Sequence, residues 1–305
     1  MKYRRAEDSP LFTKLKGEEH MIIAQIIANG ILMGFIYALV SVGLTLIWGV
    51  MDIINFAHGE FLMISMYTAF WMFSLFAMDP LIALPICTIL IFVIGVLTYL
   101  GIIRRVINAP GLTALLATFG LSMFLKNLAQ FLWTPNFRYI NNSMVSGKTI
   151  ELGSIVIGVP QVVAAVASII LTVAVMLFID RTRTGKAIQA TALNKNTALL
   201  MGINTKKIYA ITFGLSGACV GAAGALMATF FPIYPASGAL YSVLAFVSVA
   251  MGGFGNIKGA LFGGLIIGLA EALGGYMLGT QFKYAIVFLI YLIVIQVRPK
   301  GLFGW

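Results

Sequence analysis

The chain has 305 residues, of which 60% are hydrophobic and 10% are charged, whereas an ordinary soluble domain has roughly 25% charged residues. Twenty Lys and Arg with ten Asp and Glu cannot cover a soluble fold of this length, which excludes a soluble enzyme, a secreted disulfide scaffold and a disordered chain. The net charge of +10 fits the gathering of Lys and Arg in the cytoplasmic loops of membrane proteins, and we expect no nucleic-acid partner.

Residues 1–20 form a polar leader that differs from everything after it. They hold five basic residues and four acids, and Met21 opens the first apolar run directly. A signal peptide fits poorly because the apolar stretch is too long and lacks a small-residue cleavage site. The leader is either a short disordered segment or an upstream extension that is not native, and we favour the extension. Residues 21–304 are expected to form one membrane domain.

Nine apolar runs follow, and a helix needs about 20 apolar residues to cross the hydrocarbon core. We therefore expect an all-α fold, a polytopic transmembrane helical bundle with about eight to ten segments embedded in the lipid bilayer. A transmembrane barrel would show short alternating segments instead. Gly and Pro interrupt several runs, so some segments are expected to be broken or re-entrant. The runs cover residues 22–48, 54–76, 81–103, 112–134, 155–179, 208–231, 238–254, 259–279 and 282–297.

Lys and Arg in the connections predict the orientation of these segments. The connection 180–207 carries six basic residues and one acid, so it is expected in the cytoplasm. Counting segments backwards then places the loop 135–154 and the N-terminus outside. An external N-terminus conflicts with the basic leader. Either an extra crossing is hidden within 22–76, or the leader is not part of the natural protein.

A compact polar stretch lies between the first two runs, from Asn55 through His58 to Glu60. One His and one carboxylate are too few for a metal site, which needs three or four ligands, so we expect no metal. The stretch could close a helix boundary, line a translocation path, or relay protons through His58. Most acids lie in loops, but three are assigned to membrane segments and are functional candidates by default, because each charge costs about 2.5–3.5 kcal/mol there. They are Asp52, Glu60 and Glu271.

Glycines at spacings of three and four mark places where helix backbones can approach closely. They are Gly217, Gly221 and Gly224 in one segment, and Gly255, Gly259, Gly263, Gly264 and Gly268 in the next region. The run 252–256, Gly-Gly-Phe-Gly-Asn, indicates a helix break or a re-entrant turn. The candidates for the translocation path are Asn55, His58, Gly59, Glu60, Gly252 and Gly253.

The connection 180–207, here named the coupling loop, holds two short helical patterns, 185–192 and 197–202. Apolar residues at helical spacing in a cytoplasmic loop indicate a partner or the membrane surface. We expect Ala198, Leu199 and Met201 to form the contact face, with Gly202 ending the helix. The candidate residues for this contact are Gly185, Ala187, Ala190, Ala198, Leu199, Met201 and Gly202.

Signatures of catalysis are missing from the sequence, which has no GxSxG and no HExxH. Gly147-Lys148-Thr149 resembles the end of a P-loop, but position 142 is Asn where that motif needs Gly. We therefore expect no catalytic residue and no cofactor in this chain. If transport consumes ATP, partner subunits hydrolyse it.

Several stretches of the chain match motifs that occur together in one protein family. The stretches 43–60, GLTLIWGVMDIINFAHGE, and 118–127, TFGLSMFLKN, resemble two motifs of the permeases of ABC importers for branched-chain amino acids. The coupling loop from Gly185 to Asn204 resembles the segment that contacts the ATPase. Further similar stretches are PIYP at 232–235, GGFGNIKG at 252–259 and RPKGLFG at 298–304.

The resemblance implies a multi-pass protein of a bacterial or archaeal plasma (inner) membrane that does no bond chemistry itself. Its expected partners are a second related permease, two ATP-binding subunits and an extracytoplasmic substrate-binding protein. The expected cargo is a branched-chain or similar apolar amino acid. Urea or short-chain amides remain an alternative within the same family. A proton-coupled secondary transporter, working without ATPase partners, is an alternative from another class.

Overall fold

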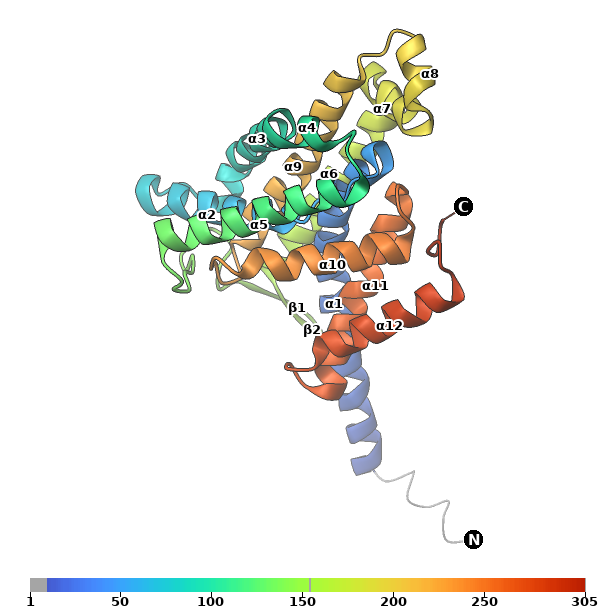
Figure 1. The fold of residues 1–305 in the computed structure, drawn as a ribbon. Helices are drawn as coiled ribbons and strands as arrows, with labels where there is room; N and C mark the ends of the chain where they lie inside the picture. Colours follow the sequence, from blue (N-terminus) through green and yellow to red (C-terminus); the bar gives the residue numbers. More distant parts are fainter. Residues whose placement is uncertain (1–9, 154, 305) are drawn as a thin grey trace.

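The structure is a computed structural model that describes residues 10–153 and 155–304. Most of the described chain is helical (Figure 1). The helices are α1 (Pro10–Met51), α2 (His58–Phe76), α3 (Pro80–Thr98), the π-helical turn η1 (Tyr99–Ile103), α4 (Arg104–Val106), α5 (Gly111–Trp133), α6 (Val159–Arg181), α7 (Arg183–Leu193), α8 (Lys195–Leu200), α9 (Thr205–Met227), α10 (Ser237–Gly252), α11 (Ile257–Leu278) and α12 (Lys283–Val297). Two strands, β1 (Thr149–Leu152) and β2 (Ile155–Gly158), form an antiparallel hairpin.

The predicted all-α membrane fold is confirmed. Within the described residues, seven helices are long and apolar enough to cross a membrane, and α10 and α12 are shorter apolar helices. These nine helices correspond one to one with the nine apolar runs. The break predicted at 252–256 is also present, because α10 ends at Gly252 and α11 begins at Ile257.

The predicted start of the fifth membrane segment at residue 155 is wrong. Residues 155–158 form strand β2, in which Gly158 pairs with Thr149, and α6 begins at Val159. Pro160 explains the later start, since proline fits the first turn of a helix where its missing N–H is not needed. The hairpin therefore belongs to the loop between α5 and α6.

Contacts between distant segments define two ends of the bundle. At one end, Lys195 Nζ donates to Asn108 Oδ1 at 3.1 Å, and the Leu302 amide donates to the Met251 carbonyl at 2.8 Å. This end carries α7, α8 and the basic coupling loop, so we name it the inner, cytoplasmic end. At the outer end, Gln25 Nε2 donates to the carbonyl of Val156 in the hairpin at 2.8 Å.

Helix α1 runs from the outer end to the inner end without a second crossing. It continues to Met51, and α2 starts at His58, so the extra crossing proposed within 22–76 is absent. Residues 10–20 of the leader continue the same helix, and residues 1–9 lie outside the described residues. The first segment therefore starts at the end opposite the coupling loop, and the outside location of that end stays a prediction.

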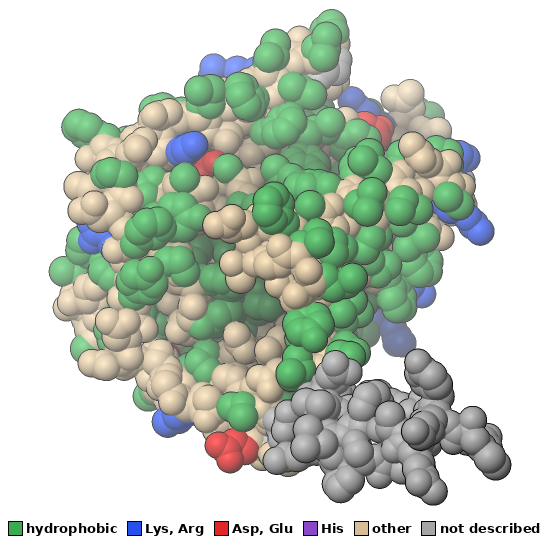
Figure 2. Space-filling model, turned by 90° about the horizontal axis from the view of Figure 1, so that it is seen from below, with side chains coloured by type: hydrophobic (Ala, Val, Ile, Leu, Met, Phe, Trp, Pro, Cys, Tyr) green, Lys and Arg blue, Asp and Glu red, His purple; other side chains and the backbone are tan. Residues whose placement is uncertain are grey.

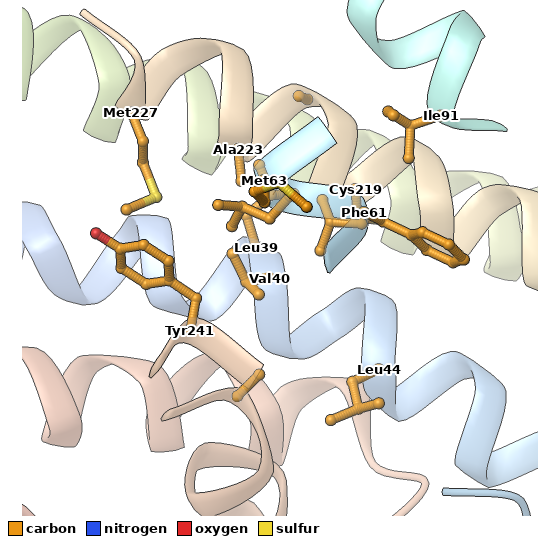
Figure 3. Close-up of a cluster of buried hydrophobic side chains, with 14 of the residues drawn as sticks. Leu39, Val40, Leu44, Phe61, Met63, Ile91, Cys219, Ala223, Met227 and Tyr241 are labelled. Atoms are coloured by element: carbon orange, nitrogen blue, oxygen red, sulfur yellow. The ribbon is translucent and has the colours of Figure 1, made fainter. Parts of the chain in front are cut away.

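The core lies where α1, α2, α3 and α9 meet α10 (Figure 3). Leu39 and Leu44 of α1, Phe61 of α2 and Ile91 of α3 are fully or almost fully buried there. Both cysteines, Cys87 and Cys219, are buried and free, as their apolar surroundings predict. Outside the core, hydrophobic side chains are spread over the face seen in Figure 2, which is the lower side of Figure 1, with Lys and Arg mostly around its rim. The large hydrophobic side chains that α3, α5, α6 and α12 expose are suited to lipid.

Close helix contacts at the predicted glycines are confirmed. A Cβ at Gly264 would lie 2.4 Å from the backbone of Ala38, and a Cβ at Gly268 would lie 2.3 Å from the carbonyl oxygen of Gly30. Helix α11 therefore packs backbone to backbone on α1. Gly217 makes the same kind of contact between α9 and Ile91 of α3, where a Cβ would lie 2.5 Å from a carbonyl oxygen.

Candidate functional site

The segment between α1 and α2 places Asn55 and His58 inside the protein, where both are fully buried. Asn55 Oδ1 accepts a hydrogen bond from the Ala57 amide at 3.2 Å and so closes the turn before α2. His58 Nε2 lies 2.8 Å from the carbonyl oxygen of Val40 in α1, which can only accept, so Nε2 carries a proton. The Asn55 bond is the geometry expected for a helix boundary, whereas the His58 bond joins the start of α2 to the interior of α1. A role of His58 in the path or in proton coupling stays a prediction.

Gly59 forms the closest helix crossing of this site. A Cβ at Gly59 would lie 1.9 Å from the carbonyl oxygen of Gly238 in α10, and 2.5 Å from Ser242 Oγ. The Gly59 amide donates to Ser242 Oγ at 2.7 Å, which satisfies one of the free N–H groups in the first turn of α2. The N-terminal ends of α2 and α10 therefore lie in close contact, and the next residue, Glu60, packs beside Gly238 of α10.

Glu60 is 1% exposed to bulk solvent, yet it lines a cavity of about 540 Å³ between α2, α5 and α10. Ser122 Oγ of α5 donates to Glu60 Oε1 at 3.2 Å, whereas Oε2 has no hydrogen-bond partner within the described chain. The cavity combines charged, amide and apolar side chains. Its lining residues are Glu60, Phe119, Ser122, Met123, Lys126, Asn127, Gln130, Ala236 and Ala239.

The other two candidate acids lie elsewhere. Asp52 follows the last residue of α1 and is exposed at the inner end, so it is not inside a membrane segment. Glu271 of α11 accepts a hydrogen bond from Tyr37 Oη at 2.5 Å and forms a salt bridge with Lys283 of α12. These contacts join α1, α11 and α12 near the outer end, which gives Glu271 a structural role.

Gly252 and Gly253 are not brought to the cavity at Glu60. A Cβ at Gly252 would lie 2.1 Å from the carbonyl oxygen of Gly259, so Gly252 allows the tight turn between α10 and α11. Gly253 has a φ of 103° and packs against Gly304 in the C-terminal tail. Their neighbours Phe254 and Gly255 line a separate cavity of about 490 Å³ at the inner end. Their assignment to the path stays a prediction.

The coupling loop forms two short helices, α7 and α8, as its sequence pattern predicts. Gly185 is buried against the end of α6, where a Cβ would lie 2.3 Å from the Phe178 carbonyl oxygen, and Ala187 packs onto a small apolar cluster with Ile188. Ala190 is half-buried. Gly202, with a φ of 80°, follows the end of α8 and lies in open space.

The predicted contact face of α8 needs one correction. Leu199 and Met201 are exposed, but Ala198 is only 3% exposed and packs inside the chain. Leu200 and Leu193, which the spacing does not single out, are 88% and 80% exposed. The apolar residues that α7 and α8 present at the inner end are therefore Leu193, Leu199, Leu200 and Met201.

Comparison with known proteins shows which family has a similar sequence. Residues 26–296 match the family described as branched-chain amino acid transport system / permease component. The chain belongs to this permease family. It is 32% identical to the high-affinity branched-chain amino acid transport system permease protein BraD of Pseudomonas aeruginosa, over 92% of this chain and 95% of that protein. It is also 32% identical to the permease protein LivH of Escherichia coli K12, over 94% of this chain and 97% of that protein.

Two further relatives differ in how much of the chain they cover. A probable branched-chain amino acid transport permease of Methanocaldococcus jannaschii is 29% identical over 96% of this chain and 95% of its own length. The D-allose transport permease of E. coli K12 matches only 47% of this chain and 45% of its own length, at 35% identity. No solved structure matches the chain significantly. As a member of this family, the chain is a multi-pass transport protein of the plasma membrane.

One group of functional candidates in the permease is not predicted from its sequence. Ser122, Lys126, Asn127 and Gln130 of α5 line the same cavity as Glu60, and Ser122 bonds to the Glu60 carboxyl group. The signal that identifies them is Lys126, a basic residue inside the apolar run 112–134. The sequence prediction rests on acids within apolar runs and does not use this base.

Proposed function

We propose that this permease is the membrane-spanning subunit of an ATP-driven, binding-protein-dependent importer that carries branched-chain amino acids across the plasma membrane. The observation that carries the proposal is the family match over residues 26–296, with nine apolar helices in the described part of that region. The relatives that cover more than nine tenths of the chain are named for branched-chain amino acids. The alternatives, urea or short-chain amides as cargo and proton-coupled transport, have no comparable support.

ATP hydrolysis in this proposal belongs to two partner subunits, and the permease chain itself carries no cofactor and no ATPase site. The only stretch that resembles a P-loop, Gly147–Thr149, leads into strand β1 and not into a helix. A P-loop cradles phosphate at the N-terminus of the helix that follows it. An extracytoplasmic binding protein would deliver the amino acid at the outer end.

A second permease would cover the outer side of α5. This helix carries Asn127 and Gln130 on an exposed surface, together with Lys126, which is half-buried. Polar residues within a membrane segment normally face protein or a water-filled cavity, because hydrocarbon cannot solvate them. A related permease chain packed along α5 would enclose these side chains, and the two chains together would form a central pathway.

The ATPase subunits would dock on the inner end, against Leu193, Leu199, Leu200 and Met201. These side chains are exposed on a basic, cytoplasmic loop, where lipid does not cover them. Burying them in a groove on a partner contributes about 25 cal/mol per Å² before the costs of association. ATP binding would then push on α7 and α8 and switch the pathway between outward and inward access.

Leu200→Glu combined with Met201→Glu is expected to lower substrate-stimulated ATP hydrolysis at least about tenfold and to release the ATPases from the purified permease. Both side chains point away from the chain's own core, so the membrane domain should still fold. The measurement is co-purification of the ATPase subunits together with leucine-stimulated hydrolysis. Ala198→Glu is unsuitable for this test, because Ala198 is buried in the chain itself.

The matched control is Met144→Glu, which places the same charge on an exposed methionine in the loop at the outer end. It should leave both ATPase binding and hydrolysis at the wild-type level. Wild-type co-purification and hydrolysis in the Leu200→Glu, Met201→Glu protein would show that this surface does not contact the ATPases.

A further inference from the structure

The cavity between α2, α5 and α10 holds two opposite charges that do not contact each other. Glu60 lies in the first turn of α2, and Lys126 lies on α5 one helical turn beyond Ser122, which bonds to Glu60. Only Lys283 and Glu271 form a salt bridge within 4.0 Å in the part of the chain that the structure describes. The carboxylate of Glu60 and the ammonium group of Lys126 are therefore separated across the cavity.

Both charges lack sufficient partners in the chain itself. Glu60 Oε2 is buried without a hydrogen bond, and Lys126 makes neither a salt bridge nor a side-chain hydrogen bond to any residue described here. A buried, unpaired polar atom is costly, so a native protein that keeps one commonly supplies its partner from outside. Glu60 Oε2 is such an atom, packed beside Gly238 of α10, and Lys126 is a half-buried charge on the same cavity. An acid and a base that line one cavity without pairing indicate a ligand that carries both signs.

We propose that this cavity is a transient binding site for the zwitterionic part of the transported amino acid, in which Glu60 pairs with the α-ammonium group and Lys126 with the α-carboxylate. The inference rests on the proposed function and deepens it, because it assigns a site to the cargo within the permease. The cavity volume of about 540 Å³ lies within the range of roughly 300–1,000 Å³ found for small-molecule pockets.

The remaining walls fit the rest of such a ligand. Phe119 and Met123 of α5 and Ala239 of α10 provide apolar surface for an aliphatic side chain. The cavity opens on the exposed side of α5, where the second permease would cover it. In that arrangement the amino acid lies between the two permeases, on the pathway from the outer end to the inner end.

The charge pair also distinguishes between classes of cargo. Urea, short amides and sugars are neutral, so hydrogen bonds alone satisfy them and a separated acid and base add nothing to their binding. A zwitterion that leaves water needs a partner for each charge. The arrangement of Glu60 and Lys126 therefore selects amino acids over neutral cargo.

The test measures ATP-driven leucine uptake, below saturation, by the full complex in proteoliposomes, and expresses it per assembled complex. Lys126→Met and Glu60→Gln are each expected to lower uptake at least about tenfold, since each removes a charged hydrogen bond to the ligand. Lys126→Arg keeps the charge and should retain uptake within about threefold of wild type. Lys148→Gln, in the outer loop, is the control and should leave uptake unchanged.

The variants at Lys126 decide the outcome of the test even if the Glu60→Gln protein fails to assemble. Lys126 is half-buried, and its replacement breaks no hydrogen bond or salt bridge to any residue that the structure describes. Lys126→Met with uptake within twofold of wild type would overturn the site, whatever Glu60→Gln does. If Lys126→Met and Lys126→Arg were equally impaired, the charge would not matter and the proposal would also be wrong. If the wild-type complex itself accumulates no leucine, the proposed function fails and not the site alone.

Discussion

Replacing Gly59 with alanine is expected to remove most of the folded permease from the membrane. The added Cβ would lie 1.9 Å from the carbonyl oxygen of Gly238, a contact that only a separation of α2 from α10 can relieve. Overpacking of this kind costs about 3 kcal/mol or more, at the upper end of its usual range. A loss of this size lowers abundance at least severalfold. The measurement is the amount of monodisperse protein after detergent extraction, with its melting temperature.

The matched control for this prediction is Gly101→Ala, in the π-helical turn η1. A Cβ at Gly101 meets no atom within 4 Å, so this change should leave yield and melting temperature near the wild-type values. If Gly59→Ala and Gly101→Ala behave alike, the close crossing of α2 and α10 is not a feature of the folded protein.

Glu271→Leu is expected to lower the free energy of unfolding by about 2 kcal/mol. The change leaves the Lys283 ammonium group without its salt bridge and the Tyr37 hydroxyl without its acceptor. The value lies below the range for a fully buried pair, because the Lys283 side chain keeps 28% of its exposure and Glu271 keeps 11%. Thermal unfolding of the solubilised protein measures it, and Glu151→Gln, an exposed acid on β1, serves as the control.

Replacing all three polar side chains of this cluster with apolar ones should restore the stability that Glu271→Leu removes. The triple variant Tyr37→Phe, Glu271→Leu, Lys283→Met leaves no uncompensated polar group from this cluster, and apolar replacement of a complete buried pair is often neutral or stabilising. We therefore expect its melting temperature to return close to that of the wild type. A triple variant as unstable as Glu271→Leu would mean that the cluster stabilises the outer end through packing and not through its charges.

The membrane segments could be predicted from the sequence because their signal is local. Each crossing needs about 20 apolar residues, and this requirement is visible in the composition of each run. The glycines of α9 and α11 are visible for the same reason, because their spacing of three or four residues places them on one helix face. The hairpin at 149–158 is less clear, since β-branched residues such as Val156 and Ile157 fit either a strand or a buried helix.

The site could be predicted only in part because its contacts are tertiary. Residues 55–60 are recognisable as a polar stretch, but the bond from His58 to Val40 depends on how α2 packs against α1. Helical spacing predicts that α8 has an apolar face, but it does not determine which side packs inward. The pattern therefore does not reveal that Ala198 is buried against the chain itself and that Leu200 is exposed.

ATP-driven uptake tests the central claim most directly. The complex of this permease with its second permease and ATPases is placed in proteoliposomes, with the binding protein outside and ATP enclosed, and labelled leucine is measured. We expect accumulation that requires enclosed ATP, persists when the pH gradient is collapsed, and is not reduced by excess urea or acetamide. Accumulation of urea without leucine, or leucine uptake by the permease alone driven by a pH gradient without ATP, would contradict the account.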